Sequence, residues 1–126
     1  MKGGCYCKKI VFEIKGDPFW MSACHCVDCR KISGAPYAVW VGFKTNEVTW
    51  HGNRKIYSSS EKVNRSFCSS CGSSLSWEQK EKPENIFLTV GSLDNAGNLK
   101  IQKHYWVGQK LPWVHITDDA KQELIS

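Results

Sequence analysis

The seven cysteines of this 126-residue chain fall into three tight groups, and this grouping constrains the fold more than any other feature. The groups are Cys5-Tyr6-Cys7, Cys24-His25-Cys26-Val27-Asp28-Cys29 and Cys68-Ser69-Ser70-Cys71. A disulfide needs Cα atoms roughly 4.4–6.8 Å apart with suitably directed side chains, which cysteines one or two residues apart seldom offer each other. A tetrahedral zinc site instead takes two thiolates from one short turn and two from a distant one. The spacing therefore predicts metal binding rather than a disulfide framework.

Four of the cysteines complete one site when the first and last groups combine. Residues i and i+2 of an extended strand point to the same face, so Cys5 and Cys7 can direct both sulfurs at one ion. Cys68 and Cys71 can do so from a turn, because Gly72 after them can take the positive φ that tight metal turns require. We therefore predict a closed, structural zinc site that joins the N-terminal segment to the middle of the chain, with the ligands Cys5, Cys7, Cys68 and Cys71.

The middle group supplies three ligands, Cys24, Cys26 and Cys29, and no fourth cysteine remains. Three protein ligands with an open position are typical of catalytic zinc, so we predict a second Zn²⁺ here and two per chain. Alternatively, a histidine closes this site and makes it structural too. The candidate histidines for that position are His51, His104 and His115. Strand alternation turns His25 away from the neighbouring sulfurs, so we expect it on the surface or in packing.

The remaining composition is that of a small intracellular domain. With a mass of 14.3 kDa and 41% hydrophobic residues, the chain can bury one modest core, so we expect a single domain over residues 1–126. Glu13 interrupts the N-terminal apolar run, and the longest apolar stretch, 37–43, is too short for a membrane span. We expect a cytoplasmic protein without a membrane partner. The net charge of +5 lies in scattered basic pairs, so nucleic acid is not an expected partner.

Short apolar and aromatic runs predict a mainly β fold of short antiparallel strands with one or two short helices. The expected strands are 9–14, 37–43, 48–50, 73–77, 86–90 and 100–106. A helix is expected at 27–32, where Ser33-Gly34 ends it, and a terminal helical turn at 118–124.

Four segments that span nearly the whole chain carry a family resemblance. They are Gly3-Gly4-Cys5-Tyr6-Cys7, Cys24 to Gly34, Phe67 to Gly72, and His104 to Trp106 with Pro112-Trp113. Together they resemble the glutathione-dependent formaldehyde-activating enzyme family, which includes centromere protein V. The resemblance implies a zinc-stapled β-tent fold, the same two zinc sites and a carbon–sulfur lyase activity. The named member condenses glutathione with formaldehyde to S-hydroxymethylglutathione, so a small thiol such as glutathione and a small aldehyde are the implied partners.

The charge of the second site agrees with thiol chemistry. Zinc with three thiolates carries a single net negative charge, which makes it a poor Lewis acid for water. An incoming thiol would bind as a thiolate and stay nucleophilic toward an aldehyde carbon. Arg30 or Lys31 could offset the added negative charge or hold a substrate carboxylate. The alternative, at least as well supported, is that both are exposed cations beside a metal-binding turn. The rival interpretation is a non-catalytic zinc module that binds a protein, glutathione or nucleic acid.

Aromatic residues near the C-terminus admit two interpretations. Tyr105, Trp106 and Trp113 either wall a pocket over the open zinc or pack in the core and at its rim. His104 is a candidate acid–base group because imidazole titrates near neutral pH.

Overall fold

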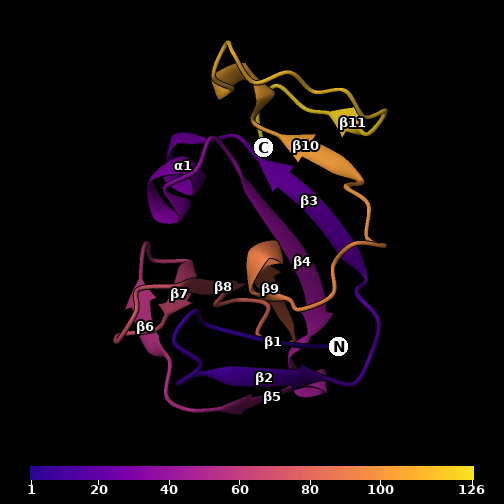
Figure 1. The fold of residues 1–126 in the computed structure, drawn as a ribbon. Helices are drawn as coiled ribbons and strands as arrows, with labels where there is room; N and C mark the ends of the chain where they lie inside the picture. The colour runs from indigo at the N-terminus through magenta and orange to yellow at the C-terminus, as the bar shows by residue number, and fades with distance from the viewer.

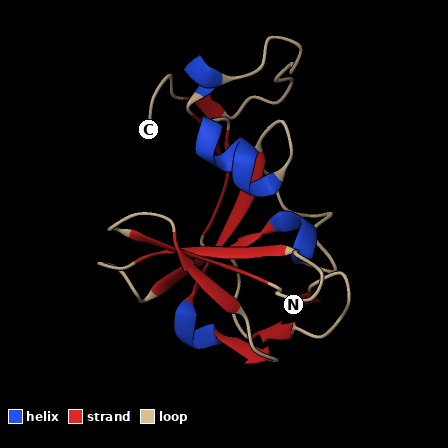
Figure 2. Ribbon diagram, turned by 90° about the vertical axis from the view of Figure 1, so that its left-hand side faces the viewer, coloured by secondary structure: helices blue, strands red, loops and turns tan.

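The computed structural model describes residues 1–126, and short strands dominate it (Figures 1 and 2). The strands are β1 (Lys2–Gly4), β2 (Val11–Ile14), β3 (Trp20–Cys24), β4 (Ala38–Lys44), β5 (Val48–His51), β6 (Lys55–Ser58), β7 (Val63–Phe67), β8 (Ser74–Gln79), β9 (Asn85–Thr89), β10 (Lys103–Tyr105) and β11 (Lys121–Gln122). The helical elements are α1 (Val27–Ser33) and the 3₁₀ turns η1 (Thr45–Glu47), η2 (Val90–Ser92) and η3 (Val107–Gln109). None of them has the length and hydropathy needed to cross a membrane.

The strands form two sheets. The smaller sheet has the order β1-β2-β5 and is antiparallel throughout. The larger sheet has the order β11-β10-β3-β4-β9-β8-β7-β6, and within it only β10 runs parallel to its neighbours, β3 and β11. In Figure 1, β3 and β4 rise from the small sheet toward α1 and β10, so the upper half of the molecule is built around their far ends. The predicted mainly β fold of antiparallel sheets is therefore confirmed.

The main core lies where the small sheet meets β4 and β9. Alternation along β2 buries Phe12 and Ile14 while their neighbours face solvent. They pack in one cluster with Val41 and Phe43 of β4 and Leu88 of β9. Full burial of such side chains stabilises a fold by roughly 1.5–3 kcal/mol each. This core fixes β4, which carries one wall of the site described below.

The six strands expected from sequence are present with shifted ends, and the helix expected at 27–32 is α1. The helical turn expected at 118–124 is wrong, because this segment contains the edge strand β11. The backbone N–H of Glu123 donates to the carbonyl of His104 at 2.9 Å, and the Glu123 carboxylate lies 3.2 Å from Lys103 Nζ. An isolated helical turn has little stability of its own, so pairing with the sheet prevails.

Candidate metal centres and the adjoining cleft

The sulfurs of Cys5, Cys7, Cys68 and Cys71 lie within 4.8 Å of one another. Cys7 Sγ is 3.6 Å from Cys5 Sγ and 3.7 Å from Cys68 Sγ. Tetrahedral bonds of 2.3 Å to zinc place sulfurs about 3.8 Å apart, so the donor set fits this ion. Hydrogen bonding from the Ser73 hydroxyl, 3.2 Å away, and from its N–H lowers the pKa of Cys71 to about 5. This environment favours the thiolate form that metals bind.

Two turns, one in each contributing segment, bring these four sulfurs together. The extended conformation expected at Cys5 and Cys7 is wrong, since β1 ends at Gly4 and the chain then turns, but the two sulfurs do meet as expected. Cys5 N–H donates to the Ile10 carbonyl at 2.9 Å and so closes that turn. The positive φ predicted for Gly72 is confirmed at 79°, and its N–H donates to the carbonyl of Cys68 at 2.7 Å.

The sulfurs of Cys24, Cys26 and Cys29 form the second group, also within 4.8 Å of one another. β3 ends at Cys24, and Cys26 keeps an extended backbone with φ −67° and ψ 160°. The Cys26 sulfur lies 3.3 Å from Cys24 Sγ and accepts a hydrogen bond from the Cys29 N–H, which caps the start of α1. Gly34 ends that helix in the left-handed conformation, with φ 64°. The start of a short helix thus fixes all three sulfurs within one segment.

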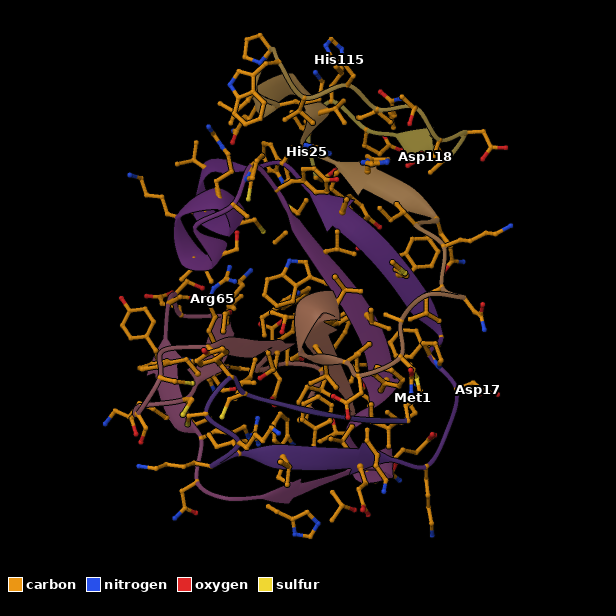
Figure 3. The ribbon with its side chains drawn as sticks, in the orientation of Figure 1. Met1, Asp17, His25, Arg65, His115 and Asp118 are labelled. Carbon is orange, nitrogen blue, oxygen red and sulfur yellow. The ribbon has the colours of Figure 1, made fainter.

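This second group includes no histidine or carboxylate ligand. His51 and His115 are exposed, and Figure 3 places His115 in the C-terminal loop beyond β10. The Cys24 thiol lowers the pKa of Cys29 to about 6 by hydrogen bonding, against burial, with further lowering from Trp40 and Arg65. Hydrogen bonding to Cys29 and burial raise the pKa of Cys24. This environment favours the thiolate form of Cys29 over that of Cys24.

The two inner histidines form a buried chain of contacts beside the second group. His25 is fully buried, and its Nε2 lies 3.0 Å from His104 Nδ1. His104 Nε2 lies 3.0 Å from the carboxylate of Asp118. Burial, reinforced by the charges of His104 and Lys110, lowers the pKa of His25 to about 4. His25 is thus a packing residue, and both ring nitrogens of His104 are engaged in joining the C-terminal segment to the end of β3.

A cleft of about 530 Å³ opens beside the second group, and two of its three cysteines line it. The lining residues are Trp20, Ser22, Cys24, Cys29, Trp40, Val63, Arg65, Trp77, Gln79, Phe87, Tyr105, Trp106 and Ser126. Trp77 and Phe87 stack face to face, with ring centroids 4.4 Å apart. A concave, aromatic surface beside thiolates is typical of a small-molecule site.

The structure shows which of the residues that sequence alone associated with this site line the cleft and which lie outside it. Tyr105 and Trp106 line the cleft, whereas Trp113 is 64% exposed and lies outside it. Arg30 and Lys31 follow the ligands on α1, and neither is among the lining residues. The cation in the cleft is instead Arg65 of β7, which Figure 3 shows below α1. Nothing in its sequence neighbourhood indicated this role, because only strand pairing brings β7 near α1.

Fold and site together define a small, mainly β protein with two cysteine groups able to hold metal ions, one of them facing a cleft. Residues 1–109 match the family described as glutathione-dependent formaldehyde-activating enzyme, and the chain belongs to this family. It is 31% identical over 109 residues to an uncharacterized lyase of Schizosaccharomyces pombe, a match that covers 86% of this chain and 80% of the yeast protein.

A solved structure shares the fold. It is the crystal structure of a Rhodobacter sphaeroides protein, with a TM-score of 0.64 and 21% sequence identity. The match covers 78% of this chain and 92% of the bacterial one.

Proposed function

We propose that this protein is a zinc-dependent carbon–sulfur lyase that interconverts a thiol and a small aldehyde with their S-hydroxyalkyl adduct. The observation that carries the proposal is the position of Cys24 and Cys29, which belong both to the three-sulfur group and to the wall of the cleft. Family membership and the lyase name of the yeast relative support the same reaction class. Glutathione and formaldehyde, which the family description names, are the first pair to test.

The reaction needs no oxidant or reductant. The thiol S–H bond breaks, the sulfur bonds to the carbonyl carbon, and the carbonyl oxygen takes up a proton to become a hydroxyl group. The reverse reaction breaks the same carbon–sulfur bond. Zinc, when held by Cys24, Cys26 and Cys29 with a fourth position open, would lower the pKa of an incoming thiol while leaving its sulfur nucleophilic.

The chain's own residues would position the reactants and exclude water. The aromatic side chains of the cleft, among them Trp40 and Trp106, present apolar walls to the reacting atoms. In such a site, charges interact more strongly than in water. The guanidinium of Arg65 would then offset the negative charge that a substrate thiolate adds beside Cys29. The Cys5, Cys7, Cys68 and Cys71 group would hold a structural zinc.

Two measurements test this function. X-ray absorption at the zinc edge, with and without glutathione, should show one added sulfur ligand on part of the bound zinc. Exchange spectroscopy by NMR should show faster exchange between formaldehyde and its glutathione adduct with wild-type protein than with Cys26→Ser protein at equal concentration. The variant is the necessary control, because the uncatalysed addition is already fast. Equal rates would reject the lyase activity, and a thiol effect on the zinc spectrum would then favour a binding module.

A further inference from the structure

One cation in the cleft, Arg65, has no carboxylate partner. Arg65 Nη1 is buried and has no hydrogen-bond partner. Its Nε donates to the Ser59 hydroxyl at 3.2 Å, and its Cζ lies 5.9 Å from the centroid of the Trp40 ring. None of the ion pairs of the molecule includes Arg65. A buried donor without a partner costs free energy, which a ligand with an acceptor group can recover.

Arg54 is an arginine with a structural role, and its partners can be compared with those of Arg65. Its Nη1 lies 3.4 Å from the carboxylate of Glu78 and equally far from the hydroxyls of Ser66 and Ser76. Its Cζ also stacks 3.8 Å from the centroid of the Trp50 ring. Arg54 Nη1 therefore has partners within the chain, whereas Arg65 Nη1 is a buried donor without one.

Aromatic side chains dominate the rest of the cleft, and Arg65 is the one cationic side chain among its lining residues. The aromatic lining residues are Trp20, Trp40, Trp77, Phe87, Tyr105 and Trp106. Such rings favour a planar apolar group, which can stack on them or meet their edges. The lining includes no aspartate or glutamate, although Ser126 at the end of the sequence is part of it. Glutathione has no ring to place against these aromatic side chains, so it complements this surface less well than an aromatic thiol does.

We propose that the cleft selects a thiol with an aromatic body and a single carboxylate, and that Arg65 binds this carboxylate. The inference rests on the proposed function in that the substrate sulfur would meet the group of Cys24, Cys26 and Cys29. The ring would lie against the aromatic walls, and the carboxylate would accept hydrogen bonds from the guanidinium fork. Arg65 is then a specificity-determining residue, and the bond chemistry stays with the thiolate group.

Calorimetric titration of zinc-loaded, full-length protein tests this selection without any variant. The probes are 4-(mercaptomethyl)benzoate, phenylmethanethiol, 3-mercaptopropionate and glutathione. The first combines ring, carboxylate and thiol, and should bind about tenfold or more tighter than each of the others, since each lacks one recognised feature or adds an unmatched charge. Equal affinity of 4-(mercaptomethyl)benzoate and 3-mercaptopropionate, or tightest binding of glutathione, would overturn the proposal.

Substitution of Arg65 tests its role. Arg65→Met should weaken 4-(mercaptomethyl)benzoate about tenfold or more beyond the weakening of phenylmethanethiol, whose thiolate also loses the nearby positive charge; this difference is the scale of a lost charge-assisted hydrogen bond. Arg65→Lys should restore part of the affinity, because it keeps the charge and loses the fork. Arg54→Lys is the matched control and should lower the melting temperature without changing this preference. If Arg65→Met binds both probes as the wild type does, Arg65 is not the carboxylate-binding residue.

A thiol-free analogue separates this inference from the proposed function. If 4-methylbenzoate binds and responds to Arg65→Met while no thiol adds a sulfur to the zinc shell, the cleft inference stands and the lyase proposal fails. If thiols add a sulfur and form adducts but Arg65→Met changes nothing, the lyase proposal stands and the inference fails.

Discussion

The two cysteine groups use the same ligand chemistry but occupy different places in the chain. The closed group joins residues 5–7 to residues 68–71 and lies in a cluster with buried Ile10 and Leu75. The open group lies within residues 24–29 at the start of one short helix, and it faces the aromatic cleft. A metal that joins distant segments closes a long loop and so contributes to folding, whereas a metal on one segment closes almost none. We therefore propose that the first group maintains the fold and that the second takes part in the chemistry.

The largest expected effect follows from breaking the closed group. Cys68→Ser removes a buried cysteine sulfur, and zinc binding energy at such a site is also folding energy. We expect a loss of about 5 kcal/mol or more, comparable to the whole stability of a small domain. Circular dichroism and thermal melting should show a largely unfolded chain. A cooperative transition near that of the wild type would mean that this group does not maintain the fold.

A smaller effect is expected at the open group. Cys26→Ser removes a ligand, but serine is itself a favourable helix N-cap, so α1 keeps its start. We expect a folded protein destabilised by roughly 1–2 kcal/mol that retains one of two zinc ions. Metal analysis and melting curves provide the measurement.

Mild chelation of the wild type is the control for that variant. It should remove one zinc readily, from the group with three protein ligands, and leave the second zinc and the fold in place. If Cys26→Ser unfolds the chain as Cys68→Ser does, or if both zinc ions leave together, the two groups do not differ in the way described.

The smallest expected effects come from alanine substitution of two glycines, one near each cysteine group. Gly72 and Gly34 both have positive φ, and a Cβ added at either meets no atom within 4 Å. Alanine at each position should therefore cost about 1–2 kcal/mol through backbone strain alone. Gly72→Ala should also speed zinc loss from the closed group, whereas Gly34→Ala should leave both zinc ions bound. Equal rates of zinc release from the two variants would show that the turn geometry at Gly72 does not matter to its metal.

Local patterns in the sequence predicted much of this molecule. Cysteine spacing predicted both metal groups, and Gly72 predicted the turn beside one of them, because each depends on residues close in sequence. The sequence did not indicate β3 or β7, which have mixed polar and apolar residues and depend on their partners in the sheet. Arg65 was missed for the same reason, since its place in the cleft depends on long-range register. The identity of the metal, the single domain and the cytoplasmic location stay predictions.

The cysteines of the cleft and the residues of its walls come from separate parts of the chain. The sulfurs come from residues 24–29, whereas most of the walls come from β4 and from strands β7 to β10. A substitution of a wall residue such as Phe87 or Tyr105 would reshape the cleft without moving a metal-binding cysteine. During evolution, a scaffold of this kind can therefore exchange one substrate for another while its bond-forming chemistry is inherited unchanged.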